Sequence, residues 1–259
     1  MGLMKREEYA KGSMFKNFRE DWVFRGTYDY NSTYFFEMNG AYNGSEQFGP
    51  GYRFDFFPSL ALGWNVTNEK FWKIDQINRL KLRYSIGMVG DDNVSGGRWL
   101  YASQLSYGGY SRIGERTDAT SPYRFYRESV VGNPDIHWEK ALKNNVGVEL
   151  GLLKDMFSIT YDYFTEDRTD VLLAGGSRSV PAFFGTTPPS ANVGEVKSNG
   201  HELEIKFNKA WNTGWHFWSA LSIAHTENEI IFKDDPALLD PHLKAAGYAI
   251  GQTKTSVST

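Results

Sequence analysis

The chain has 259 residues, of which 41% are hydrophobic and 16% aromatic, a composition far too apolar for a disordered protein. Its 28 Lys and Arg residues against 31 Asp and Glu residues give a formal charge of -3, so there is no net basic field for nucleic acid. The sequence contains no cysteine, which excludes disulfides, thiolate metal sites and thiol catalysis.

Hydropathy excludes one kind of membrane protein and leaves another open. The mean hydropathy is -0.49, and no run of about 18 apolar residues is present, so we expect no membrane-spanning helix. A transmembrane strand needs only about 9 to 11 residues with apolar side chains at every second position, so a β-barrel stays compatible with this hydropathy.

Eight segments alternate, with a period of two, between apolar or aromatic side chains and small, polar or charged ones. This is the pattern of a strand with one apolar face. In chain order the predicted strands cover residues 22–30, 34–43, 58–65, 80–88, 145–152, 157–163, 201–207 and 215–223. Helical patterns are nearly absent, so we predict an all-β chain.

The predicted connections alternate in length along the chain. The shorter ones cover residues 31–33, 67–79, 153–156 and 208–214, and the longer ones cover 44–55, 89–143 and 165–199. In an antiparallel meander, alternate connections lie at opposite ends, which predicts one end with tight turns and one with large loops. This asymmetry is typical of transmembrane β-barrels, with short periplasmic turns and long extracellular loops. A soluble sandwich with a core of aromatic side chains remains the alternative.

Several separate segments of the sequence resemble those of a known protein family. They are YFFEMNGAYNGSE at 34–46, RFDFFPS at 53–59, LKLRYSIG at 80–87, GNPDIHWEK at 132–140, DYF at 162–164 and ANVGEVKSNGHE at 191–202. In this order they resemble the barrel of SusC/RagA-type TonB-dependent outer-membrane transporters, over most of the chain.

The resemblance implies a barrel of about 22 strands with a plugged lumen in the outer membrane of a Gram-negative, Bacteroidetes-like bacterium. We therefore expect residues 1–259 to be an internal part of a large transmembrane barrel, with the plug domain, the TonB-engaging segment and the remaining strands absent from this chain. The implied partners are the rest of its own barrel and plug, a SusD-like surface lipoprotein, TonB, outer-membrane lipid and an oligosaccharide or peptide substrate. No nucleic acid is expected.

Two groups of residues are candidates for function in such a transporter. The first is a lumen-facing wall made of charged residues on the predicted strands: Arg25, Asp29, Glu37, Lys81, Arg83, Glu149, Asp162, Glu202 and Glu204. The second is a set of aromatic residues in the longest loop, suited to contact with a substrate or a partner: Trp99, Tyr101, Tyr107, Tyr110, Tyr123, Phe125 and Tyr126. Alternatively, these rings pack the loop against itself, as a loop of this length requires in order to be ordered.

Enzyme chemistry finds no support in the sequence. The segment from Asp91 to Gly96 resembles the first half of a calcium loop, but position twelve is Ala102 where a bidentate Glu is required. Glu166, Asp167 and Asp170 are expected to be solvated acids in a loop, and the five histidines lack metal-ligand spacing. We predict no enzyme activity, no metal and no cofactor. The predicted function is the barrel segment of a TonB-coupled importer of glycan or peptide oligomers, and the alternative is a soluble β-rich glycan-binding module.

Overall fold

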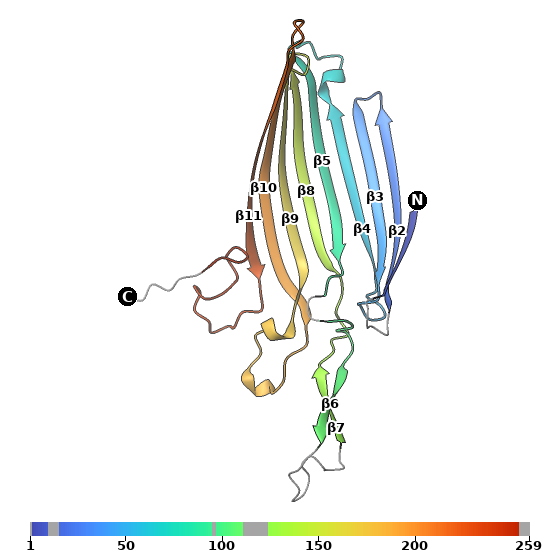
Figure 1. Ribbon diagram of the computed structural model, residues 1–259, viewed down its shortest axis with the longest axis vertical. Coiled ribbons are helices and arrows are strands. Elements are labelled where there is room, and N and C mark those ends of the chain that lie inside the picture. Colours follow the sequence, from blue (N-terminus) through green and yellow to red (C-terminus); the bar gives the residue numbers. More distant parts are fainter. Residues whose placement is uncertain (1, 10–15, 95–96, 111–123, 254–259) are drawn as a thin grey trace, which may run out of the picture.

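The computed structural model describes residues 2–9, 16–94, 97–110 and 124–253 (Figure 1). The strands are β1 (Gly2–Tyr9), β2 (Lys16–Tyr30), β3 (Tyr34–Ser45), β4 (Phe54–Asn65), β5 (Ile77–Asp91), β6 (Gln104–Tyr110), β7 (Arg124–Val130), β8 (Glu139–Leu152), β9 (Phe157–Leu173), β10 (Ala191–Ala210) and β11 (His216–Phe232). Three short 3-10 helices lie between them: η1 (Val66–Asn68), η2 (Gly175–Ser177) and η3 (Ala182–Phe184). No helix in these ranges is long and apolar enough to cross a membrane.

Nine of the strands form a single antiparallel sheet in the order β1-β2-β3-β4-β5-β8-β9-β10-β11. Strands β6 and β7 form a separate hairpin that projects from one end of this sheet (Figure 1). The order confirms the predicted antiparallel meander. In the part of the chain that the structure describes, the only other sheet is this small hairpin, so the sandwich alternative is wrong.

All eight predicted strands are present, and most extend beyond their predicted bounds. The predicted loop 165–199 shrinks to 174–190 because β9 and β10 continue into it, and the predicted loop 89–143 shrinks to 92–138 and contains β6 and β7. Glu166, Asp167 and Asp170 therefore lie on β9 and not in a loop. Strand β1 escaped prediction because consecutive charges from Lys5 to Glu8 hide any alternation.

The two ends of the sheet differ as predicted (Figure 1). The end that we name the turn end carries the connections 31–33, 66–76, 153–156 and 211–215, and the loop end carries 46–53, 92–138 and 174–190. The β2–β3 turn is tight because Asn31 and Ser32 both have φ of 52°, and the Asp29 carboxylate accepts the Ser32 N–H at 2.7 Å. Two consecutive positive φ values are the requirement of a type I′ hairpin turn.

A small hydrophobic core lies at the loop end. Its buried members come from the loops and the adjoining strand ends: Phe48, Phe57, Leu100, Ile136, Trp138 and Leu172. The Trp138 ring lies 5.2 Å from that of Phe48 and 5.4 Å from that of Phe57, and its indole N–H donates to the Arg53 carbonyl at 3.1 Å. This core joins segments that are far apart in the sequence and orders the loops.

Polar side chains fasten the same loops together. The Asn133 side chain donates to the Ser190 carbonyl at 2.9 Å, and the Asn192 side chain donates to the carbonyls of His137 and Asp170 at 2.9 and 2.8 Å. The blocks at 132–140 and 191–202 therefore contain residues that position the loops relative to β9 and β10.

Candidate functional site

Register separates the side chains of the sheet into two faces. Gly63, Arg83, Gly147, Asp162 and Glu202 lie opposite one another on five successive strands. The next row, on the opposite face, consists of Leu62, Tyr84, Val146, Tyr163 and His201. Because side chains alternate between faces along each strand, one face is polar and the other is mainly apolar.

All nine charged residues of the predicted wall lie on the polar face, in four neighbouring rows of that face: Arg25, Asp29, Glu37, Lys81, Arg83, Glu149, Asp162, Glu202 and Glu204. The meander thus brings together charges that are up to 179 positions apart, since 204 minus 25 is 179. Their role as a wall remains a proposal.

Arg83 is the centre of the polar face. Its Nε lies 2.9 Å from Glu149 Oε1, and its Nη2 lies 3.0 Å from Asp162 Oδ2, so one guanidinium joins β5, β8 and β9. Gly147 makes room for this arrangement, because a Cβ atom there would lie 2.5 Å from Asp162 Oδ1. The three side chains are half-buried, and a single guanidinium joins two carboxylates that come from different strands.

Other charges of this face are also paired with neighbours. The charged groups of Arg25 and Glu37 are 2.9 Å apart, and those of Lys206 and Glu204 are 2.7 Å apart. Lys206 was not among the predicted wall residues. The Lys81 ammonium lies 4.6 Å from the centre of the Phe35 ring. The polar face therefore carries both signs of charge, largely in pairs that neutralise each other.

The polar face extends further toward the loop end than predicted. Lys143 and Glu166 lie opposite each other and their charged groups are 3.1 Å apart, and Arg168 also pairs with Glu166. The alternation of β9 continues beyond residue 165 and could have predicted this extension of the strand. The many charged residues there are, however, also typical of a loop.

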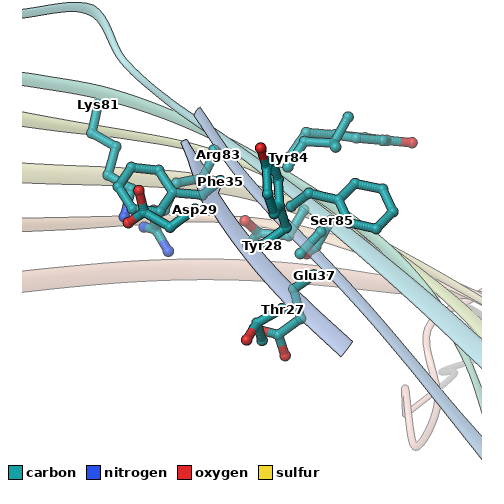
Figure 2. Close-up of a pocket in the computed structure, with 14 residues that line it drawn as sticks. Thr27, Tyr28, Asp29, Phe35, Glu37, Lys81, Arg83, Tyr84 and Ser85 are labelled. Atoms are coloured by element: carbon teal, nitrogen blue, oxygen red, sulfur yellow. The ribbon is translucent and has the colours of Figure 1, made fainter. Parts of the chain in front are cut away.

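A groove of about 410 Å³ opens beside β2, β3, β4 and β5. Figure 2 shows Asp29, Phe35, Lys81 and Arg83 gathered on one side of it. Thr27 and Glu37 also line it, so the groove offers carboxylates, an ammonium, a guanidinium and an aromatic ring. Such a surface can hydrogen-bond polar oligomers.

Large apolar side chains are exposed on the opposite face. Tyr28 is 62% exposed and Val146 49%, and further exposed members of this face include Phe36, Met38, Leu62, Leu82, Tyr84, Leu221 and Ile223. Monomeric soluble proteins rarely leave so large an apolar surface uncovered.

Aromatic rows border this apolar face on β2, β3 and β4. Tyr30, Tyr34 and Trp64 lie opposite one another at the turn end, and both Tyr34 Oη and Trp64 Nε1 donate to Glu69, at 2.5 and 3.1 Å. Trp22, Tyr42 and Phe56 form the equivalent row near the loop end. Rings with an apolar body and a polar tip at both borders are the pattern of interfacial girdles.

The predicted aromatic loop residues separate into two groups. Tyr107, Tyr110, Phe125 and Tyr126 lie on the β6–β7 hairpin, Trp99 and Tyr101 lie beside the 46–53 loop, and Tyr123 falls outside the described residues. Within the hairpin, the Tyr107 ring is 5.9 Å from Tyr126 and 6.2 Å from Tyr110. Desolvation and a hydrogen bond with Tyr110 raise the pKa of Tyr107, which keeps the phenol neutral. The rings thus pack against one another, yet Tyr107 is 51% and Tyr126 67% exposed.

The carboxylates in the segment that resembles a calcium loop make other interactions. The Asp91 carboxylate accepts the Asn93 N–H at 2.9 Å, and Asp92 lies 2.9 Å from Arg19. Among the residues described here, no group of three or more His, Asp and Glu side chains is placed to hold a metal ion.

Comparison with known proteins places this sheet in a family. Residues 17–251 match the family model described as "TonB dependent receptor-like, beta-barrel". The chain is 28% identical over 211 residues to the TonB-dependent receptor SusC of Bacteroides thetaiotaomicron, which covers 80% of this chain and 20% of SusC. It is 27% identical over 207 residues to the TonB-dependent receptor P39 of Formosa agariphila, which covers 79% of this chain and 18% of that receptor. The chain therefore spans about a fifth of the length of these curated relatives.

Solved structures agree on the fold. The RagAB peptide importer in its open-open state superposes with a TM-score of 0.76 at 20% identity, over 90% of this chain and 25% of that one. The closed-closed state gives a TM-score of 0.69 at 21% identity, over 83% and 22%. Proteins of this type are transporters and not enzymes. The chain therefore belongs to the TonB-dependent receptor-like β-barrel family, with sequence similarity to part of SusC and a fold similar to part of the RagAB importer.

Proposed function

We propose that this chain forms part of the barrel wall of an outer-membrane, TonB-coupled importer of oligomeric nutrients. One observation carries the proposal: within a single sheet, the same strands carry charged side chains on one face and exposed apolar side chains on the other. A barrel wall needs this division, because one face meets lipid and the other meets a polar lumen. The nine wall residues centred on Arg83 then face the lumen, and the loop end is extracellular.

The remaining parts of the importer come from outside this segment. Strands β1 and β11 are the two edges of the sheet, and an edge in a bilayer would leave backbone groups unsatisfied. We infer that further strands of a longer polypeptide close the barrel, and that the plug domain and the TonB-engaging segment belong to the same polypeptide. The matched relatives, which are about four times as long as this chain, support this division.

The paired charges of the wall and the matched relatives support a class of substrate. Charges locked in pairs, such as Arg25 with Glu37, leave a polar wall without a strong field of either sign, which suits glycans or peptides of low net charge. The RagAB structural neighbour is a peptide importer, so both glycan and peptide oligomers are candidates. A surface lipoprotein of the SusD type is the expected partner at the loop end.

Localisation tests the proposal against the soluble glycan-binding alternative. The full-length receptor is expressed in a Bacteroidetes host, and its membranes are fractionated. We expect recovery in the outer membrane, a shift in gel mobility on heating, and uptake of a labelled oligomer that stops when TonB is deleted. Recovery of the full-length protein from the soluble fraction as a sugar-binding monomer would overturn the proposal.

A further inference from the structure

A second cavity lies at the loop end, on the apolar-face side of the sheet and separate from the polar wall. It measures about 450 Å³. Phe54, Trp99 and Tyr101 supply its aromatic surfaces, and Glu20, Glu46 and Arg53 supply its charged groups. Glu20 and Phe54 are both opposite Gly44, which places one wall of the cavity on β2 and β4 at the loop-end limit of the apolar face.

The aromatic surface contributed by β4 is held in place before any ligand arrives. The Phe54 ring lies over Gly44, because a Cβ atom at position 44 would come within 2.3 Å of Phe54 Cε1. The Phe54 ring also stacks against the Tyr42 ring, with ring centres 5.2 Å apart and an angle of 18° between the ring planes. Phe54 therefore presents a flat and fixed ring to the cavity.

The loop segment that lines the cavity contains a residue with a strained backbone. Trp99 has a φ of 57°, a left-handed conformation that bulky side chains rarely adopt. The Arg98 guanidinium lies 4.6 Å from the centre of the Trp99 ring, and Arg98 Nη2 is 2.5 Å from Glu46 Oε1. Backbone strain of this kind persists where the surrounding structure over-determines it, and it concentrates at ligand-binding sites.

We propose that this cavity is a saccharide-binding site. The apolar C–H face of a pyranose ring can stack on the Trp99 or Phe54 ring, while Glu20, Glu46 and Arg53 hydrogen-bond its hydroxyl groups. Two carboxylates disfavour a phosphate or nucleic-acid ligand, and the charged groups disfavour an acyl chain. Because the cavity lies at the loop-end limit of the apolar face, the sugar can come from a free oligosaccharide or from the headgroup of an outer-leaflet glycolipid.

The test measures sugar binding by the full-length receptor in detergent, without uptake, so its failure would leave the transport proposal untouched. The probes are a panel of neutral hexasaccharides and, in a separate arm, purified lipopolysaccharide. The variants are Trp99→Ala and Tyr101→Ala, with Trp99→Phe as the conservative replacement. Phe71→Ala is the matched control, because Phe71 is an exposed aromatic residue at the turn end.

We expect both alanine variants to weaken binding about tenfold or more, Trp99→Phe to retain most of it, and the control to equal the wild type. An effect on hexasaccharides identifies free oligosaccharide as the ligand, and an effect on lipopolysaccharide alone identifies the glycolipid. Unchanged melting temperatures of the variants show that the loops are intact. Absence of wild-type binding to every probe, or equal binding by wild type and variants, would overturn the proposal.

Discussion

At Gly147 of the polar face, a side chain would have to displace the paired Arg83 and Asp162 side chains. A Cβ atom there would lie 2.5 Å from Asp162 Oδ1 and 2.9 Å from Arg83 Nη2. We predict that Gly147→Leu separates Arg83 from Asp162 and destabilises the barrel by about 1 to 3 kcal/mol, the usual cost of overpacking. The measurement is the temperature at which the full-length receptor loses its folded gel mobility.

Gly176→Leu is the matched control for this change. Gly176 is exposed, and nothing lies within 4 Å of the position that its Cβ would take, so we expect no change in melting temperature. Equal melting temperatures for the two variants would show that the crowding at Gly147 does not hold Arg83 in place.

Trp138 connects the loops through both packing and a hydrogen bond. It is 1% exposed, touches Phe48 and Phe57, and donates to the Arg53 carbonyl. Trp138→Ala should destabilise the loop end by about 3 to 5 kcal/mol, because it leaves a cavity and removes one of the two hydrogen bonds of the Arg53 carbonyl, which keeps the Ser45 N–H. Limited proteolysis is the measurement, and cleavage within residues 92–138 should accelerate. Trp211→Ala, at a Trp that is 47% exposed, should leave the cleavage rate unchanged; equal acceleration by both variants would contradict the assigned role.

At the scale of a strand, the key property is that neighbouring residues meet different solvents. On β8, Val146 is 49% exposed on the apolar face, and Asn145 lines the groove on the polar face. We predict that Val146→Arg costs about 2 to 4 kcal/mol if it lies near the bilayer midplane, whereas Asn145→Arg is tolerated. The yield of receptor in the outer membrane, measured after heat-shift electrophoresis, distinguishes the two variants. An equal yield would contradict the assignment of the faces.

Alternation made the strands predictable because it is a local property. A period of two assigns both a strand and its two faces, so the sequence alone places Arg83 and Asp162 on one face without knowledge of their contact. The hairpin of β6 and β7 was missed because its alternation is short and interrupted by Gly108 and Gly109.

The loop end could not be predicted in the same way. Its core joins Phe48, Ile136 and Leu172, and the saccharide cavity joins Phe54 to Trp99, in each case across long sequence separations. No local sequence pattern predicts such long-range contacts, because they depend on how separate loops fold over the sheet. The sequence singled out Trp99 and Tyr101 as aromatic residues in a loop but did not separate them from the hairpin group.

At the scale of the whole sheet, the apolar band crosses the rows of paired residues obliquely. One row on the apolar face contains Met88 and Leu142 on β5 and β8, but continues as Asp167, Lys197 and Glu229 on β9, β10 and β11. Closer to the turn end, β9 and β10 carry the opposed Phe157 and Phe207. The band therefore slides toward the turn end from β5 to β11, as expected when strands tilt relative to the bilayer normal in a barrel wall.

The β6–β7 hairpin is joined to this sheet at one narrow point, which makes it separable. The Gly132 N–H donates to Ser103 Oγ at 3.1 Å, and the Asn133 N–H donates to the Leu100 carbonyl at 2.9 Å, so the two ends of the excursion are already in contact. We predict that replacing residues 105–129 with a short Gly-Ser linker leaves outer-membrane insertion and melting temperature unchanged, because core residues Leu100, Ile136 and Trp138 are kept, as is Val130, which packs against them.

The same excision should reduce capture of the partner or substrate, since it removes the exposed rings of Tyr107 and Tyr126. Co-purification of the surface lipoprotein with the full-length receptor measures this loss. Deletion of residues 131–138 serves as the contrast, because it removes Ile136 and Trp138 and should abolish folding of the loop end. If the excised receptor failed to insert, the hairpin would belong to the folding core; if it inserted and bound the lipoprotein as tightly as the wild type, the aromatic rings would serve only to pack the hairpin.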